Sequence, residues 1–141
     1  MANVEVKEMT IDAMDINLQM VLDFIEEQVN ICGCDPATLI SLQIAVEEIF
    51  VNVAHYSYNP EIGPITIKTE IAKDDPKSIT VVFRDHGVPY NPLEKPDPDV
   101  TLGAEERQIG GLGIYLVKNS MDEVYYNFEN GENVFTIKKN L

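Results

Sequence analysis

The chain has 141 residues, of which 45% are hydrophobic, and 24 acidic side chains against 10 basic ones give it a formal net charge of −14 at pH 7. The length suits one domain with a sizeable core, and the charge argues against nucleic acid and anionic membrane surfaces as partners, because both attract clustered lysine and arginine. The N-terminus lacks the basic start and apolar run of a signal peptide, and no segment approaches the roughly 18 consecutive apolar residues of a membrane span, so a cytoplasmic protein is expected.

Apolar periodicity and turn residues predict the secondary structure in chain order. The expected elements are a strand at 4–11, helices at 15–32 and 35–56, strands at 65–72 and 79–84, a helix at 112–120, and a terminal hairpin of strands at 123–129 and 133–139. Residues 86–110 hold four prolines and three glycines without sustained periodicity, which predicts a long loop. Because helices and strands are partly segregated, the order predicts an α+β two-layer sandwich, with one mixed sheet and helices on one face.

The helix expected at 35–56 is the most informative segment. It is apolar nearly all round, which predicts burial. Four polar residues nevertheless fall within an arc of about 60° at 100° per residue; they are Ser41, Glu48, Asn52 and His55. A buried carboxylate is costly unless a polar group meets it. The stripe therefore indicates either a hydrogen-bonded row facing solvent or a ligand site, and the helix alone does not distinguish the two.

Two further segments are suited to a nucleotide, although each has a simpler interpretation. Asp85-His86-Gly87 follows an apolar strand, where the carboxylate could accept from an exocyclic amino group and the glycine could leave room for a flat base. Taken alone, the same tripeptide is more typical of a plain turn. Gly110-Gly111-Leu112-Gly113 opens a helix, where backbone N–H groups can converge on an anion, or where the glycines simply form a flexible loop.

Taken together, these segments resemble the N, G1 and G2 boxes of the GHKL ATP-binding superfamily. The box residues are Glu48-x-x-x-Asn52, Asp85-x-Gly87 and Gly111-x-Gly113. Within the superfamily the chain looks most like the anti-sigma regulatory kinases, because residues 85–92 (DHGVPYNP) resemble their D-x-G-x-P-[FY]-[DN]-P segment and residues 121–124 (MDEV) resemble their M-D-E-V. The resemblance covers nearly the whole chain and implies a single ATP-binding domain at 1–141 with the Bergerat fold.

This resemblance implies that the helix at 35–56 supplies a metal ligand and a base. Asn52 would ligate Mg²⁺ through its amide oxygen, and the ion would hold the phosphates of ATP. Glu48, one turn earlier, would act as general base for an attacking hydroxyl or water. Its neighbour Glu47 lies about 100° off the Asn52 face, so Glu48 is the preferred base.

The resemblance also implies which residues bind the nucleotide. Asp85 would accept from the adenine amino group, and Gly87 would make room for the ring. Gly111 and Gly113 would bring backbone N–H groups to the phosphates. Thr136 stands where the family often has a threonine near the adenine.

The long loop would form an ATP lid at about 91–110. Arg107 in this lid could reach the terminal phosphate, where transition-state charge needs stabilisation. One departure concerns the N box: the anti-sigma kinases usually have a histidine four residues after the asparagine, but here Tyr56 stands there and His55 comes one residue early. This departure leaves ATP binding expected and phosphoryl transfer open.

The function implied by the resemblance is that of an ATP-dependent serine/threonine protein kinase and anti-sigma factor. It would phosphorylate a small antagonist protein, hold a sigma factor in another state, and form a homodimer. An alternative is an ATP-binding partner-switch module without phosphoryl transfer. A histidine kinase is disfavoured because the only histidines, His55 and His86, lie inside the N-box helix and the D-x-G turn. Loss of nucleotide binding is disfavoured because every box residue is present.

Overall fold

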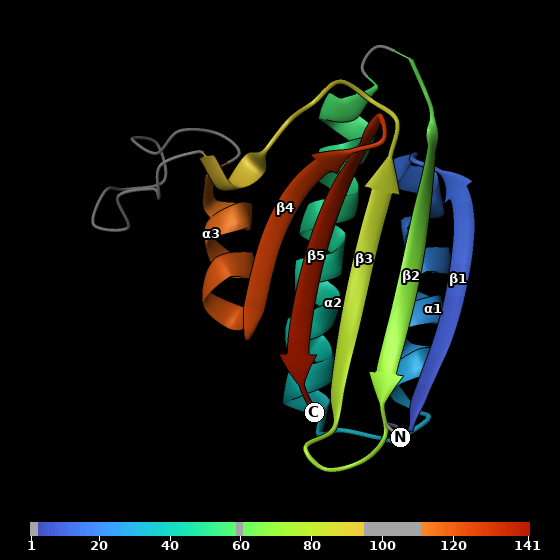
Figure 1. Ribbon diagram of the computed structural model, residues 1–141, viewed down its shortest axis with the longest axis vertical. Helices are drawn as coiled ribbons and strands as arrows, with labels where there is room; N and C mark the ends of the chain where they lie inside the picture. Colours follow the sequence, from blue (N-terminus) through green and yellow to red (C-terminus); the bar gives the residue numbers. More distant parts are fainter. Residues whose placement is uncertain (1–2, 59–60, 95–110) are drawn as a thin grey trace.

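The computed structural model describes residues 3–58, 61–94 and 111–141, and it has two layers, with three helices on one face of a five-stranded sheet (Figure 1). The helices are α1 (Leu18–Val29), α2 (Pro36–Asn52) and α3 (Gly111–Ser120). The strands are β1 (Val4–Asp12), β2 (Pro64–Ala72), β3 (Ser78–Asp85), β4 (Glu123–Glu129) and β5 (Glu132–Asn140), in the spatial order β1-β2-β3-β5-β4. The α+β class and the placement of the helices on one face are confirmed.

The pairing of the strands differs from the expected mixed sheet. Each neighbouring pair among the described strands is antiparallel. β3 and β4 point the same way, because each is antiparallel to β5 (Figure 1). β5, however, turns back at Asn130 and Gly131, which both have positive φ, and inserts itself between β3 and β4. The two strands that point the same way are therefore never hydrogen-bonded neighbours.

The helix boundaries shift slightly from those expected. The segment at 15–32 begins with a 3-10 turn (Asp15–Asn17), and α1 ends at Val29, four residues before Gly33 adopts a φ of 78°. The start of α2 is as expected, because Asp35 Oδ1 accepts from Thr38 N at 2.7 Å. At its other end, α2 stops at Asn52 and continues as a π turn (Val53–Ser57), a widened form of helix that is common near functional sites.

The core lies between the sheet and the helices. α2 runs between α1 and α3 behind the strands (Figure 1) and buries Leu42, Val46 and Phe50 completely. The facing side of the sheet contributes fully buried isoleucines and one phenylalanine, namely Ile65, Ile67, Ile71, Ile79, Ile137 and Phe83. Burying such side chains stabilises the fold by roughly 1.5–3 kcal/mol each. The layer arrangement thus follows directly from the alternation in the central strands.

The segment Pro36–Ser57 is long and apolar enough, at a mean hydropathy of 1.5, to pass a length-and-composition test for a membrane span. The core helix of a soluble protein passes the same test, and α2 lies between α1 and α3 and packs against both.

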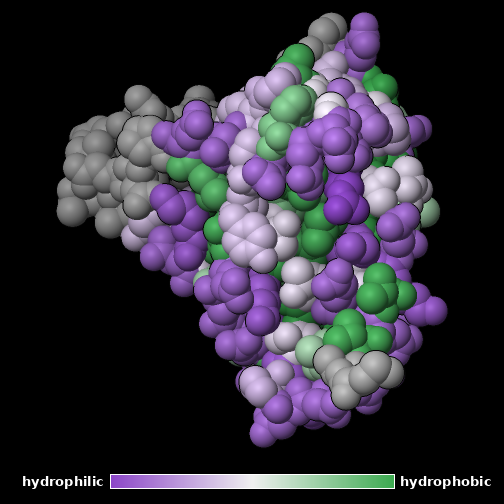
Figure 2. Space-filling view, in the orientation of Figure 1, coloured by the Kyte–Doolittle hydropathy of each residue, from purple (hydrophilic) through white to green (hydrophobic). Residues whose placement is uncertain are grey.

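The opposite face of the sheet is open and largely polar. Figure 2 views the molecule from this side and shows hydrophilic residues over much of the strands. Lys68, Glu70 and Arg84 are among the partly exposed residues that alternate with the buried core positions. Each strand therefore separates two environments, and the position of a residue along the strand decides which face it occupies.

Candidate functional site

A pocket lies where the C-terminal end of α2 meets the end of β3 and the start of β5. Its empty volume, which includes open solvent, is about 340 Å³. The walls are apolar, formed by Ile49, Val53, Pro92, Ile114 and Phe135. The polar groups that reach it are Asn52, Ser57, Asp85, Tyr90, Tyr126 and Asn133. The structure thus brings two of the residues predicted from sequence, Asn52 and Asp85, into one largely apolar pocket.

Asp85 is the acidic residue that lines the pocket, and it is buried, with 3% of its surface exposed. Its Oδ1 accepts from Gly87 N and from Asn133 Nδ2, both at 2.9 Å. Both hydrogen bonds found for this carboxylate within the described ranges go to Oδ1. The second oxygen, Oδ2, is therefore left as a hydrogen-bond acceptor on a residue that lines the pocket, as recognition of an amino group requires.

Asn133 is the main pocket residue that sequence reasoning missed. It is 4% exposed, lies directly opposite Asp85 in the β3–β5 ladder, and donates to Val88 O at 2.9 Å as well as to Asp85. Its Oδ1 accepts from Tyr90 N at 3.0 Å and from the Tyr126 hydroxyl. A signal was present in the sequence, since Asn133 occupies the alternate position that Phe135 and Ile137 fill with apolar side chains.

The expectation for Thr136 needs correction. Thr136 pairs with Val82 and Tyr125, on the open face of the sheet, whereas Asp85 and Asn133 belong to the face that carries the helices. Thr136 follows Asn133 by three residues, and an odd offset along a strand moves a side chain to the other face. The sheet itself therefore separates Thr136 from the pocket, and Asn133 holds the position beside Asp85.

Glu48 lies against the start of α3. A Cβ added at Gly113 would overlap Glu48 Oε2, so the absence of a side chain at Gly113 is what lets the carboxyl approach. Burial, and secondarily the charge of Glu47, raises the pKa of Glu48 above its ordinary value of 4.5. The N-box and G2-box residues are thus in direct contact, although 65 positions separate them in the chain.

Most of the predicted lid, residues 95–110 with Arg107 among them, lies outside the described residues. Gly111 is described only as the first residue of α3.

Gly87 has a structural role that the sequence did not indicate. A Cβ at this position would overlap the backbone carbonyl oxygen of Ser57, which accepts from Val88 N at 3.0 Å. Ser57 is the last residue of the π turn, so the end of this turn presents the carbonyl to the G1 turn. Gly87 is thus required by contact between two backbone segments, whatever ligand the pocket takes.

The two glycines are expected to respond differently to alanine. Gly87→Ala meets backbone and should lower the free energy of unfolding by about 1–3 kcal/mol, whereas Gly113→Ala meets the end of a flexible side chain and should cost less than about 1 kcal/mol. Urea unfolding of both variants would measure this. A Gly113→Ala loss equal to that of Gly87→Ala would show that the Glu48 carboxyl cannot move aside.

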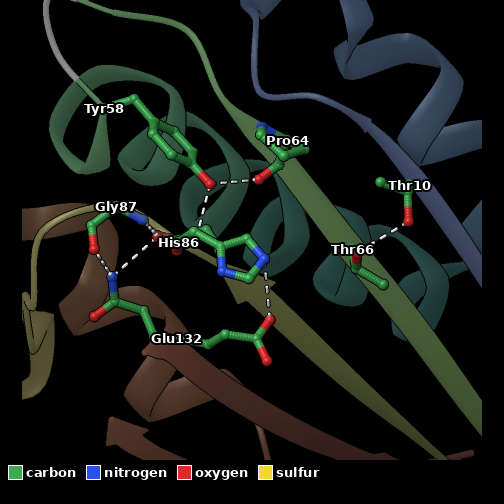
Figure 3. A network of polar contacts seen from close by, with 9 residues as sticks. Thr10, Tyr58, Pro64, Thr66, His86, Gly87 and Glu132 are labelled. Carbon is green, nitrogen blue, oxygen red and sulfur yellow. Dashed lines mark hydrogen bonds and ion pairs between the residues drawn. The ribbon is translucent and has the colours of Figure 1, made fainter. Parts of the chain in front are cut away.

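Tyr58 braces the G1 turn from the outside. Its hydroxyl donates to Pro64 O and accepts from His86 N, both at 2.7 Å, so that it connects the start of β2 to the residue after β3 (Figure 3). The His86 ring points toward Glu132, with a separation of 3.6 Å (Figure 3). Burial raises the pKa of Tyr58, so its hydroxyl keeps its proton as these hydrogen bonds require.

The polar stripe of α2 divides between several surroundings. Asn52 lines the pocket and Glu48 meets Gly113, while Ser41 lines a groove with Leu116. His55 is exposed and contacts Asp15 at 2.8 Å. Within this stripe, Asn52 lines the pocket, whereas His55 faces solvent.

Comparison with known proteins agrees with this geometry. The model of the histidine kinase-like ATPase domain family matches residues 11–139. The serine-protein kinase RsbW of Bacillus mycoides (strain KBAB4) is 28% identical over 101 residues, which cover 69% of this chain and 61% of that protein. RsbW of Bacillus cereus (strain B4264) is 29% identical over the same coverage. The chain therefore spans about three fifths of these relatives.

A solved structure shows the same fold. The crystal structure of the RsbU and RsbW domains of Rv1364c from Mycobacterium tuberculosis superimposes with a TM-score of 0.68 at 16% identity, over 97% of this chain and 32% of that one. The family match spans nearly the whole sequence, and Asn52 and Asp85 line one pocket. The chain belongs to the histidine kinase-like ATPase domain family, and within the GHKL superfamily it resembles the anti-sigma regulatory kinases.

Proposed function

We propose that this chain is an ATP-dependent serine/threonine protein kinase that acts as an anti-sigma factor by partner switching. The observation that carries the proposal is the convergence of Asp85 and Asn52 in one pocket, with Glu48 one helical turn from Asn52 and against Gly113. Asp85 would thus accept a hydrogen bond from the adenine base, Asn52 would offer an oxygen ligand to a metal ion, and Glu48 would provide a carboxyl group close to Asn52.

The pocket suits an adenine base. Its apolar walls would cover the faces of a flat ring, and the buried Asp85 carboxylate keeps one oxygen for the exocyclic amino group. A carboxylate accepting from an amino group forms a charge-assisted hydrogen bond, which is stronger in a low-dielectric pocket than in water.

The residues present also fit magnesium bound together with a nucleotide. The described part of the chain contains no cluster of three or more His, Cys, Asp or Glu residues that could hold a metal alone. Mg²⁺ commonly takes few protein ligands and shares phosphate oxygens and water, so the Asn52 amide oxygen would be its protein contact. When bound, the ion would neutralise phosphate charge during transfer.

Glu48 would hold the proton of the attacking hydroxyl. A base works best when its pKa lies near the working pH, and the burial of Glu48 moves its pKa in that direction. The backbone at Gly111 and Gly113, at the start of α3, would receive the phosphates, and Arg107 in the lid at about 91–110 would meet the terminal phosphate.

The acceptor would be a serine or threonine of a small antagonist protein, and the same protein would hold a sigma factor in its other state. We propose that residues 1–141 form one domain that acts as a homodimer in the cytoplasm. The similarity to RsbW proteins named serine-protein kinases supports the acceptor chemistry.

A second candidate is an ATP-binding partner switch without phosphoryl transfer. It is favoured by the surroundings of the N-box asparagine, where His55 turns to Asp15 at the surface and Tyr56 lies against Tyr90, with ring centroids 6.1 Å apart. The histidine that the anti-sigma kinases usually carry is therefore not in the pocket.

The test is calorimetric titration of ATP with and without Mg²⁺. Asn52→Ala should reduce ATP affinity about tenfold or more in Mg²⁺ and leave the affinity in EDTA unchanged, because only the metal-dependent part is lost. Asn127→Ala, an exposed asparagine on β4, is the matched control. Absence of ATP binding by the wild type would overturn both candidates, whereas binding without γ-phosphoryl transfer to a purified antagonist protein would favour the second.

A further inference from the structure

We propose that Asn133 is a positioning residue for base recognition, which orients the Asp85 carboxylate so that Oδ2 is presented to the exocyclic amino group of adenine. This inference rests on the proposed function, since it concerns how the same pocket selects its nucleotide. It assigns a role to a residue that lies outside the three boxes.

The contacts of Asn133 use its whole side-chain amide. Nδ2 donates to Asp85 Oδ1 and to Val88 O, both at 2.9 Å, and lies 3.5 Å from Gly87 O. Oδ1 accepts from Tyr90 N at 3.0 Å and from the Tyr126 hydroxyl. An amide group has two donors and two acceptor sites, so these partners satisfy all of them. The buried amide is thus held in one orientation, with the nitrogen toward Asp85.

Asp85 is oriented in turn. Oδ1 accepts from Asn133 Nδ2 and Gly87 N, and two hydrogen bonds fill the two lone pairs of a carboxylate oxygen. Rotation of the carboxylate would break both bonds in a site where unpaired polar groups are costly. Because Asp85 and Asn133 lie opposite each other in the ladder, the rigid sheet fixes the pair before any ligand binds.

This arrangement has a consequence for specificity. A fixed acceptor favours a base that offers a donor at that point, and disfavours one that offers a carbonyl oxygen there, because two acceptors would face each other without a proton. Removing the orienting amide should lower the preference for the amino group more than it lowers binding of the rest of the nucleotide.

The experiment compares ATP with purine riboside triphosphate, which lacks only the exocyclic amino group. Calorimetric titrations of the full chain in Mg²⁺ would give the ratio of the two affinities. The wild type should prefer ATP about tenfold or more. Asn133→Ala should bring this ratio close to one, mainly by weakening ATP binding. The Asn127→Ala control, on the neighbouring strand, should keep the wild-type ratio.

Asn133→Asp provides a second variant of nearly identical volume, in case the alanine variant does not fold. It places a second carboxyl beside Asp85, and two close carboxylates hold one proton with a raised pKa. At low pH the shared proton restores a hydrogen bond to Asp85, so the preference for ATP should be present. As the pH rises through that raised pKa the proton is lost, and the preference should disappear. The wild-type ratio should stay constant over the same range if the pH is kept above the pKa of adenine N1, since the phosphate groups of the two nucleotides titrate alike.

The outcomes separate this inference from the proposed function. A wild type that prefers ATP, together with Asn133 variants that keep the wild-type ratio at every pH, would overturn the positioning role and leave the ATP site intact. Equal weakening of both nucleotides would also overturn it, since that is the result of general loosening. A wild type that binds neither nucleotide would overturn both proposals.

Discussion

Glu48→Gln is expected to reduce phosphoryl transfer to an antagonist protein by about 10²–10⁴-fold while ATP binding stays close to that of the wild type. The amide keeps the size of the carboxyl group against Gly113, so the packing at the start of α3 is retained. It cannot accept a proton from the attacking hydroxyl. Single-turnover transfer from γ-labelled ATP, with calorimetry for binding, would measure both quantities.

Stability gives an independent check on the environment of Glu48. Because its pKa is raised in the folded protein, the folded state keeps a proton at pH values where the unfolded state has lost it. The contribution of Glu48 to the free energy of unfolding therefore falls as pH rises from 4.5 through the raised pKa. Glu48→Gln lacks this loss, so it should be no less stable than the wild type at neutral pH.

Glu47→Gln is the matched control for this experiment. Glu47 is the adjacent carboxylate and shares the local charge, but it lies about 100° around the helix from Glu48. Its substitution should leave transfer nearly unchanged. If Glu48→Gln transferred phosphate at the wild-type rate, or if Glu47→Gln caused the larger loss, Glu48 would not be the base. The rate of the wild type should fall at acidic pH, along a limb centred above pH 4.5.

Asp85→Asn is expected to weaken ATP binding by about 10–100-fold. An asparagine keeps one oxygen for Gly87 and Asn133, so its NH₂ group takes the place of Oδ2 and presents a donor to the donor of the base. The loss of one charge-assisted hydrogen bond is worth about 1.5–3 kcal/mol, which corresponds to this range of affinity.

Calorimetric titration of ATP with Mg²⁺ would test this effect, with Asp74→Asn as the control. Asp74 is exposed in the connection between β2 and β3, at the far end of the sheet from the pocket (Figure 1). Removing its charge changes the net charge of the protein by the same amount. Equal weakening of ATP binding by the two substitutions would indicate a general charge effect. Unaltered ATP binding by Asp85→Asn would show that Asp85 does not accept a hydrogen bond from the adenine amino group.

Local patterns were sufficient to predict most of the elements and two of the pocket residues. Each predicted helix and strand is present within a few residues, because apolar periodicity and end signals such as Asp35-Pro36 act over short distances. Asn52 and Asp85 were found because each lies at the end of an element with an unmistakable apolar pattern. Their meeting in one pocket followed from the resemblance rather than from spacing.

Prediction of the site residues failed on β5, where the face of the strand that a residue occupies decides whether it reaches the pocket. Thr136 was predicted from the threonine that the family often has near the adenine, and this resemblance did not include the register of β5 against β3. A shift of one residue reverses the face of every side chain on a strand, so an approximate position cannot decide between pocket and open face. Asn133 was overlooked for the same reason, since only the pairing of β3 with β5 shows that it lies opposite Asp85.

The sequence by itself determined the secondary-structure elements, the three boxes and the family, because these depend on residues close together in the chain. The tertiary structure alone decided that β5 inserts between β3 and β4, that the π turn brings Ser57 to Gly87, and that Asn133 orients Asp85. Each of these depends on contacts between distant segments. Such contacts form only when the whole core packs, so the pattern of residues within a single helix or strand does not predict them.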